Sequence, residues 1–97
     1  MTLQKSKHYF IITGTSRGIG EAIAKKLLTD DSNILFCISR NQNPSIGVEA
    51  FVKARALHDF ALDLNNVSDI KELVRDIFRK VNEEDAASFT LINNAGT

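Results

Sequence analysis

A glycine-rich segment near the start of the chain has the residue types and spacing best suited to chemistry. Gly14, Gly18 and Gly20 occur as G-x-x-x-G-x-G, after the apolar residues 9–12 and before a helical pattern. A strand that turns sharply into a helix directs backbone N–H groups at one point, where a phosphate can bind. Glycine suits this turn because a side chain would keep the phosphate away. No Lys-Ser/Thr pair follows the last glycine, so the segment is not a P-loop. A tight turn with close helix packing is the alternative interpretation.

A second group of polar side chains follows the next apolar stretch. Arg40 stands twenty residues after the last glycine, where a nicotinamide-binding domain faces the adenosine ribose. An acidic residue there favours NAD, whereas a cationic one accommodates the 2′-phosphate of NADP. Ser39, Arg40 and Asn41 can all donate to a phosphate, no Asp or Glu occurs in 33–43, and Arg17 adds a second cation. The pattern favours NADP(H) over NAD(H), with solvated loop arginines as the alternative.

Hydrophobic periodicity predicts the elements that position these residues. Short apolar runs predict strands, and four-residue spacing predicts helices between them. This alternation predicts an α/β fold of the Rossmann type, with three α/β/α layers and a parallel sheet of strand order 3-2-1-4 that ends after the fourth strand. The expected elements are strand 8–13, helix 18–28, strand 34–38, helix 46–56, strand 57–62, a helix from Ser68 to 81, and strand 89–92.

Two of the predicted helices carry apolar stripes that we expect to face the sheet. In the first, Ile19, Ile23 and Leu27 recur every four residues. The last helix has the stronger stripe, and Ser68 is its predicted N-cap. That stripe comprises Ile70, Leu73, Val74, Ile77, Phe78 and Val81.

The composition excludes several classes of protein. The chain has 97 residues, 43% of them hydrophobic and 25% charged, with a formal net charge of zero. It therefore lacks the basic excess typical of proteins that bind nucleic acid or membrane surfaces. It also lacks an apolar run of about 18 residues, and no leader is evident, so we expect no membrane span and a cytoplasmic protein. Cys37 is expected to be a buried thiol, and neither His8 nor His58 has the neighbours of a metal site.

Four motifs, in the right order, resemble those of the short-chain dehydrogenases/reductases. Segment 13–20 is similar to the family's cofactor motif, and Asp63-Leu64 resembles the aspartate at the end of its third strand. Asn93-Asn94-Ala95-Gly96 matches the Asn-Asn-Ala-Gly motif after its fourth strand, and Ser39-Arg40-Asn41 is typical of NADP-preferring members. The resemblance covers nearly the whole chain. Within the family, the chain is most similar to small bacterial ketone and diketone reductases related to sepiapterin and benzil reductase.

The resemblance implies a role for each matched position. The glycine segment would wrap the pyrophosphate and adenosine ribose, Arg40 would hold the 2′-phosphate, and Asp63 would meet the adenine. Asn94 would lie along the path to the nicotinamide, while Asn93 would brace the sheet. The implied cofactor-binding residues are Gly14, Thr15, Ser16, Arg17, Gly18, Ile19, Gly20, Ser39, Arg40, Asn41, Asp63, Leu64, Asn94, Ala95 and Gly96.

The chain departs from the family because it ends at Thr97. In the family, a serine and a Tyr-x-x-x-Lys motif come later. Tyr9 is the only tyrosine, and Thr13 stands where that motif has lysine. We therefore expect residues 1–97 to be the N-terminal dinucleotide-binding part of one domain, with no catalytic residue and no activity alone. The intact protein would be an NADP(H)-dependent carbonyl reductase acting on a small carbonyl substrate.

Two other functions stay open at this point. The chain could be a non-catalytic nucleotide-binding module, or a fragment that persists by self-association. Phe89, Leu91 and Ile92 lie on a fourth strand that is expected to have a bare edge, and such edges pair with other chains. We therefore expect a homo-oligomer formed through this strand or its adjacent helix.

Overall fold

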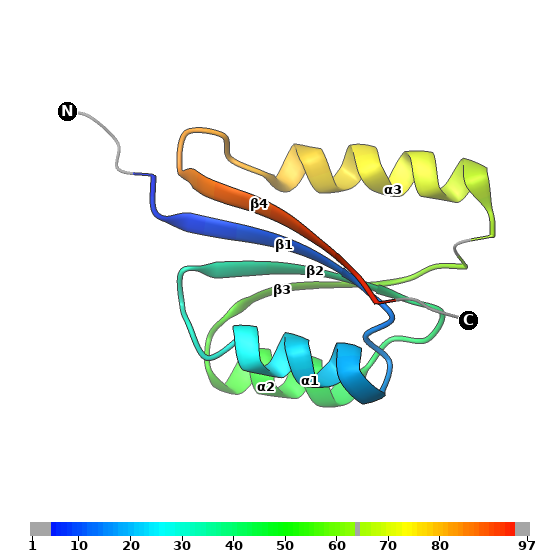
Figure 1. Cartoon of the computed structure of the whole chain (residues 1–97), viewed down its shortest axis with the longest axis horizontal. Coiled ribbons are helices and arrows are strands. Elements are labelled where there is room, and N and C mark those ends of the chain that lie inside the picture. The colour runs from blue at the N-terminus through cyan, green and yellow to red at the C-terminus, as the bar shows by residue number, and fades with distance from the viewer. Residues whose placement is uncertain (1–4, 64, 95–97) are drawn as a thin grey trace.

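The computed structural model describes residues 5–63 and 65–94. Within them, a four-stranded parallel sheet has the order β3-β2-β1-β4. Helices α1 and α2 cover one face and α3 covers the other (Figure 1). The predicted three-layer α/β/α fold and its strand order are confirmed. The elements are β1 (Lys7–Thr13), α1 (Gly18–Leu27), β2 (Asn33–Ser39), α2 (Pro44–Val52), β3 (Ala56–Ala61), α3 (Val67–Lys80) and β4 (Ala86–Asn93).

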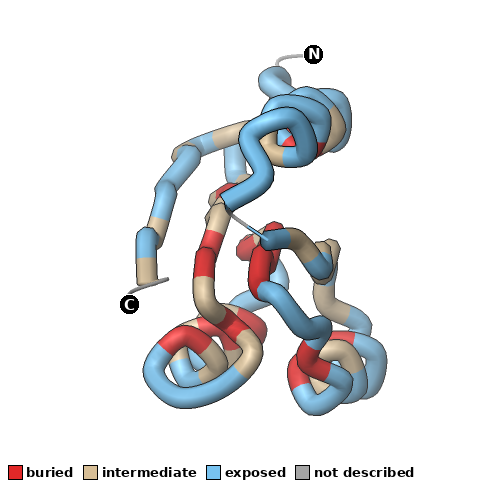
Figure 2. The backbone as a smooth tube through the Cα atoms, turned by 90° about the vertical axis from the view of Figure 1, so that its right-hand side faces the viewer, coloured by how far each residue is buried: buried red, intermediate tan, exposed pale blue. Residues whose placement is uncertain are grey.

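The core is divided between the two faces of the sheet, because successive side chains of a strand point to opposite faces. Figure 2 shows buried segments on the central strands and on the sides of the helices that face them. Burying each of these large apolar side chains stabilises the fold by about 1.5–3 kcal/mol. The face under α1 and α2 buries Ile12, Ala24, Leu28, Leu35, Cys37, Ile46 and Ala50, and the face under α3 buries Tyr9, Phe36, Ile38, Leu73 and Ile77.

Stacked aromatic rings cross the sheet on the α3 face. The ring of His58 on β3 stacks on Phe36 of β2 with centroids 5.1 Å apart. Phe36 stacks on Tyr9 of β1 at 6.3 Å, and Tyr9 on Phe89 of β4 at 6.4 Å. Phe78 of α3 completes the series against Phe89 at 5.5 Å. Such pairs add to the energy of area burial, so they tie α3 to all four strands.

Several predicted boundaries are wrong by a few residues, and side-chain capping accounts for two of them. Ser68 is not an N-cap, because Asn66 accepts a hydrogen bond from Asp69 N at 3.4 Å and α3 starts at Val67. Helix α2 starts at Pro44 rather than at residue 46, since the side chain of the preceding residue caps it and proline suits a first turn. It ends at Val52 instead of 56, and β4 starts at 86 instead of 89.

Part of each predicted apolar stripe does not face the sheet. Ile19 is 72% exposed, because α1 turns Gly20 and Ala24 inward at its start. On α3, Leu73 and Ile77 are buried, whereas Phe78 is 56% exposed and Val74 is also exposed. The stripe on α3 is therefore wider than the contact it makes in this chain.

Cys37 is buried as predicted, with no exposed surface. Burial, followed by the nearby carboxylate of Asp59, raises the pKa of its thiol to about 12. It therefore stays protonated and unreactive at neutral pH. Among the described residues, no cluster of His, Cys, Asp and Glu could hold a metal ion. No helix in the same part of the chain has both the length and the apolar character needed to cross a membrane.

Candidate functional site

The glycine turn joins β1 to α1 at the end of the sheet where the carboxyl ends of the parallel strands lie, which we call the carboxyl edge. Gly14 has φ of 73° and Gly18 has φ of 65°, both in the left-handed region that favours glycine. Arg17 occupies the N-cap position of α1 with extended backbone, and no side chain caps the helix there. The first N–H groups of an uncapped helix are open to an anion, and the helix dipole favours negative charge at this end. The turn has the local structure that a phosphate needs.

Gly20 is required for a different reason. A Cβ built at this position would lie 2.1 Å from Gly14 O and 2.6 Å from the side-chain nitrogen of Asn94. The third glycine therefore lets α1 pack against the turn and the end of β4. At Gly18 a Cβ would meet nothing within 4 Å, so its positive φ is what favours glycine there.

The end of β4 is joined to the glycine turn by hydrogen bonds. Thr13 Oγ1 donates to Asn93 Oδ1 at 3.0 Å and accepts from Asn94 N at 3.0 Å. The side-chain amide of Asn94 donates to Gly14 O at 3.2 Å. Asn93 thus braces the sheet, as expected, and Asn94 lies beside the turn. Two segments separated by about eighty residues meet at this edge.

The segment that follows β2 lies at the same edge. Gly14 N donates to Ile38 O at 2.8 Å, which joins the glycine turn to the end of β2. Ser39 is buried, and its hydroxyl donates to the carbonyl oxygen of Asn41. Arg40 and Asn41 are exposed. A cation next to the glycine turn is therefore accessible to a ligand.

Asp63 follows β3 at this edge and is also exposed. Leu62 N donates to Ser39 O at 2.7 Å, so the chain leaves β3 beside the end of β2. Asp63 Oδ1 accepts from Asn65 N at 2.9 Å, which is turn chemistry, and the described residues show no partner for its second carboxylate oxygen. Three predicted positions, Leu64, Ala95 and Gly96, lie outside the described residues.

The residues of the glycine segment differ in how far they are accessible. Arg17, Gly18 and Ile19 are exposed, and Ser16 is half-buried. Thr15 has no exposed surface, and its hydroxyl has no nitrogen or oxygen partner among the described residues. Thr15 therefore supports the turn from inside in this structure.

Asn43 is a residue that sequence reasoning missed. It is only 4% exposed, and its side-chain nitrogen donates to Thr15 O and Ser16 O, both at 3.0 Å. The same nitrogen donates to Glu21 Oε2 at 2.7 Å. Its backbone nitrogen donates to Asp59 Oδ2 at 2.9 Å. The one available signal was the Asn-Pro pair, because asparagine before proline is typical of a helix start.

Glu21 completes this polar cluster. It forms an ion pair with Lys25 at 3.0 Å, one helical turn along α1. The hydrogen bonds from Lys25 and Asn43 lower the pKa of the Glu21 carboxyl. Glu21 therefore stays ionised at neutral pH and is held away from the open side of the turn.

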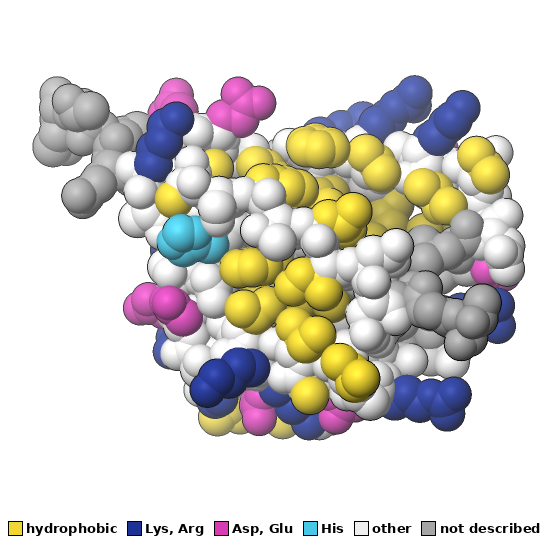
Figure 3. Space-filling view, viewed as in Figure 1, with side chains coloured by type: hydrophobic (Ala, Val, Ile, Leu, Met, Phe, Trp, Pro, Cys, Tyr) yellow, Lys and Arg dark blue, Asp and Glu magenta, His cyan; other side chains and the backbone are white. Residues whose placement is uncertain are grey.

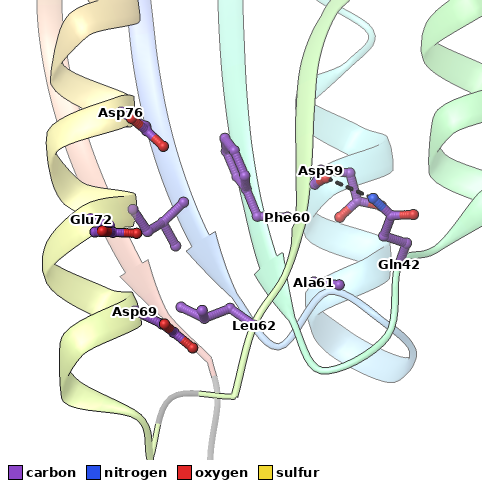
Figure 4. A pocket seen from close by; sticks show the side chains of 9 residues that line it. Gln42, Asp59, Phe60, Ala61, Leu62, Asp69, Glu72 and Asp76 are labelled. Atoms are coloured by element: carbon purple, nitrogen blue, oxygen red, sulfur yellow. Dashed lines mark hydrogen bonds between the residues drawn. The ribbon is translucent and has the colours of Figure 1, made fainter.

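A cavity of about 360 Å³ lies between the last residues of β3 and the first half of α3. Its walls include Phe60 and Leu62 on one side and the carboxylates of Asp69, Glu72 and Asp76 on α3 (Figure 4). Among the described residues, none that was predicted to bind the cofactor lines it, but Gln42 and Leu62 directly adjoin the predicted positions Asn41 and Asp63. The candidate site is thus an open surface at the strand ends, beside this acidic groove.

Comparison with known proteins identifies the family. A sequence profile described as "short chain dehydrogenase" matches residues 8–97. The chain belongs to the short-chain dehydrogenase family. Its glycine turn and its Asn93-Asn94 segment are the two parts of the family pattern that the structure brings into contact.

Individual relatives agree with this assignment. The chain is 40% identical over 91 residues to a benzil reductase ((S)-benzoin forming) of Bacillus cereus, covering 92% of this chain and 35% of that protein. It is 28% identical over 88 residues to a 3-oxoacyl-[acyl-carrier-protein] reductase of Staphylococcus epidermidis, covering 89% of this chain and 34% of the relative. The chain therefore spans about a third of the length of these curated relatives.

A solved structure shows the same architecture. A short-chain dehydrogenase/reductase from Burkholderia vietnamiensis matches with a TM-score of 0.76 and 28% identity. The match covers 94% of this chain and 42% of that structure. The four strands and three helices described above therefore correspond to part of a larger short-chain dehydrogenase domain.

Proposed function

We propose that this chain is the cofactor-binding part of an NADP(H)-dependent carbonyl reductase. The observation that carries the proposal is the contact between Asn94 and Gly14, which assembles two family motifs at one edge of the sheet. The uncapped start of α1 and the left-handed glycines supply the surface on which a pyrophosphate would lie. The described residues therefore fit a dinucleotide.

Within this proposal the binding roles follow from position and charge. The N–H groups at the start of α1 bind the pyrophosphate, and Ile19, exposed beside them, covers the adenosine side. Asp63, with one carboxylate oxygen outside its own turn, accepts from the adenine amino group. Asn94 lies between the turn and the path to the nicotinamide. The bound cofactor supplies the hydride, and this part of the protein holds and orients it.

Preference for NADP(H) is assigned to the two arginines. Arg17 and Arg40 are both exposed at the carboxyl edge. Among the described residues the ion pairs join Lys25 to Glu21 and Arg79 to Asp76, so neither arginine is held by a carboxylate. A guanidinium forms strong paired hydrogen bonds with phosphate. The 2′-phosphate is the group of NADP(H) that such a cation would select.

We further propose that this chain does not catalyse reduction alone. A reductase must deliver a proton to the developing alkoxide. Tyr9, the one tyrosine, is buried in the aromatic stack and donates to Asp85 Oδ1 at 3.0 Å. Burial raises the pKa of its phenol, and the hydroxyl lies toward the end of the sheet where Asp85 and Asn82 contact it. Tyr9 therefore cannot serve a cofactor at the opposite, carboxyl edge.

The substrate proposed for the intact reductase is a small carbonyl compound. The two relatives described above are named as reductases of a diketone and of 3-oxoacyl groups, which are both carbonyl substrates. A cytoplasmic location and self-association through β4 or α3 are part of the same proposal. A non-catalytic binding module and a self-associating fragment are the alternatives, and the exposed Phe89 and Leu91 favour self-association.

Cofactor titration tests the proposal. NADPH and NADH are each titrated with the protein while the fluorescence of the reduced nicotinamide is followed, and the absence of tryptophan leaves that signal clear. We expect tighter binding of NADPH. Equal affinities would contradict the preference for NADP(H), and no binding of either dinucleotide would leave only the fragment alternative. Reduction of benzil by residues 1–97 alone would contradict the proposed lack of catalysis.

A further inference from the structure

Asn43 connects four parts of the fold that are separate in sequence. It contacts the glycine turn, α1, the start of α2 and, through its backbone, β3. We propose that Asn43 is a positioning residue that holds the glycine turn in its phosphate-binding form and couples it to the Arg40 loop. This inference rests on the proposed function, because its consequence is read in dinucleotide affinity.

The donor geometry explains how Asn43 would act. A side-chain amide nitrogen carries two protons, and here it serves Thr15 O, Ser16 O and Glu21 Oε2 at 3.0, 3.0 and 2.7 Å. The peptide bonds of the turn are trans, so each C=O points opposite to the next N–H. With both carbonyls turned toward Asn43, the N–H groups of Ser16 and Arg17 are directed away from it. The residues that follow in the turn, Arg17, Gly18 and Ile19, are exposed.

The same contacts keep negative groups away from a phosphate. The Asn43 side chain donates to three acceptors at the turn: Thr15 O, Ser16 O and the Glu21 carboxylate. Each would repel an anion if it rotated toward the open side. Lys25 holds the other oxygen of Glu21 at 3.0 Å. Asn43 and Lys25 together hold that partly exposed carboxylate on the side of α1 that faces Asn43.

The second half of the coupling is the loop that follows β2. Asn43 Oδ1 accepts from Ser45 N at 3.0 Å and Ile46 N at 3.3 Å, so it caps α2. Its backbone N–H is held by Asp59. These bonds fix the chain three residues after Arg40. One residue therefore sets the position of the phosphate turn relative to the cation proposed to bind the 2′-phosphate.

Asn43→Asp separates this role from simple helix capping. Aspartate caps helices as well as asparagine does, so the bonds to Ser45 and Ile46 can persist. It has no side-chain donor when ionised, so Thr15 O and Ser16 O lose their partner and Glu21 meets a like charge. In the double variant Asn43→Asp with Glu21→Gln, the glutamine amide can donate to the new aspartate, so the like-charge contact is removed. Thr15 O and Ser16 O still lack the Asn43 donor. The double variant therefore recovers stability without recovering the turn.

Two measurements are made on the protein and these variants. The first is amide hydrogen exchange of residues 15–20, and the second is NADPH and NADH affinity by nicotinamide fluorescence. For Asn43→Asp and the double variant we expect exchange at the turn to rise and NADPH affinity to fall by about 2- to 13-fold, the range that loss of one hydrogen bond of ordinary strength implies. The ratio of the NADH and NADPH dissociation constants should become smaller in both variants. Asn43→Ser replaces the aspartate variant if that variant fails to fold. Serine also caps helices, but its hydroxyl is too short to reach the turn carbonyls, so we expect the same changes in turn exchange and NADPH affinity.

Asn33→Asp is the matched control. Asn33 is also buried and donates to a carbonyl of α1, Leu27 O at 2.9 Å, but at the opposite edge of the sheet. We expect it to lower thermal stability while leaving turn exchange and NADPH affinity unchanged. Full recovery of affinity in the double variant would overturn the inference, because charge repulsion alone would then explain the loss. Unchanged turn exchange in Asn43→Asp would overturn it even if the unmodified protein bound neither dinucleotide, a result that would separately refute the proposed function.

Discussion

Asn94 donates its side-chain amide to the carbonyl oxygen of Gly14 at 3.2 Å. Both atoms border the space that a Cβ on Gly20 would occupy, at 2.6 and 2.1 Å from its ideal position. The glycine turn, the first turn of α1 and the end of β4 therefore meet where there is room only for hydrogen. This contact makes the candidate site sensitive to the smallest possible side chain.

Gly20→Ala should destabilise the protein and weaken dinucleotide binding. The added methyl group must displace backbone atoms, and overpacking of this kind costs about 1–3 kcal/mol. Thermal denaturation and NADPH titration measure the two effects. Gly47→Ala is the control, since a Cβ there meets nothing within 4 Å. Replacing glycine in a helix should stabilise the protein by about 0.5–1 kcal/mol, and equal losses in the two variants would contradict the packing argument.

Arg40→Asp should shift cofactor preference from NADPH toward NADH. The change removes a cation that is exposed at the end of β2 and supplies an acceptor for a ribose 2′-hydroxyl. Loss of a charge-assisted hydrogen bond predicts a fall in NADPH affinity of about 10- to 100-fold. The ratio of the two dissociation constants measures the shift. Arg75→Asp makes the same charge change on exposed α3, and an equal shift there would show that net charge, not position, sets the preference.

The fold could be predicted almost completely from sequence because its signals are local. Strands such as Asn33–Ser39 contain continuous apolar runs, here residues 34–38, and the alternation of strands and helices restricts the topology to a few forms. Boundaries were less well predicted, because they depend on which side chain caps a helix. Asn66 and Ser68 are both good N-caps by type, and only the backbone decides between them.

Sequence could nominate residues of the candidate site only where the residue type and its local spacing are themselves the signal. The glycines and Arg40 carry recognisable types at recognisable spacing, and the structure places them at one edge. Asn43 could not be found this way, because its partners Thr15 and Glu21 lie more than twenty residues away. The exposure of Ile19 was missed for a related reason. Four-residue spacing ignores the close packing of Gly20, which rotates the start of α1.

His58 should make stability depend on pH near neutrality. Burial, and then the positive charge of Lys80, lower the pKa of its imidazole. As pH falls below about 6.5, the unfolded chain gains a proton that the folded state resists. The free energy of unfolding should therefore decline from pH 7 to pH 5.5. Urea denaturation at several pH values measures this slope.

His58→Phe should remove that part of the slope while keeping the stacking on Phe36, whose ring lies 5.1 Å away. His8→Gln is the comparison variant, because it removes the other histidine and leaves His58 in place. A slope that disappears in His8→Gln and persists in His58→Phe would refute the assignment.

Tyr9→Phe should destabilise the fold by about 1–2 kcal/mol, because it removes two part-buried hydrogen bonds of ordinary strength. The hydroxyl donates to Asp85 Oδ1 at 3.0 Å and accepts from Asn82 N at 3.1 Å, so it ties β1 to the link before β4. The ring stack itself is kept. Chemical denaturation measures the loss. Thr29→Val deletes an exposed hydroxyl that donates to Lys26 O at 2.7 Å and should cost much less.

The 97-residue chain should self-associate through one apolar surface, which we call the β4–α3 patch: Val74, Phe78, Phe89 and Leu91. Figure 3 shows hydrophobic side chains gathered over the face that carries β4 and α3. Leu91 is 63% exposed, and β4 pairs with β1 along one edge only among the described strands. An apolar edge strand of this kind pairs readily with another chain.

Leu91→Lys places a charge in the middle of this edge and should raise the dissociation constant of the oligomer at least about tenfold, equivalent to about 1.4 kcal/mol. Sedimentation velocity over a concentration series measures it. Phe51→Lys is the matched control, because Phe51 is 87% exposed on α2, on the other side of the sheet. It should leave association unchanged, since the charge is then outside the patch. A monomeric mass for the unmodified chain at the highest concentration would contradict the prediction. If both variants weakened association equally, the cause would be a general loss of surface hydrophobicity, and the assignment of the interface to β4 would be wrong.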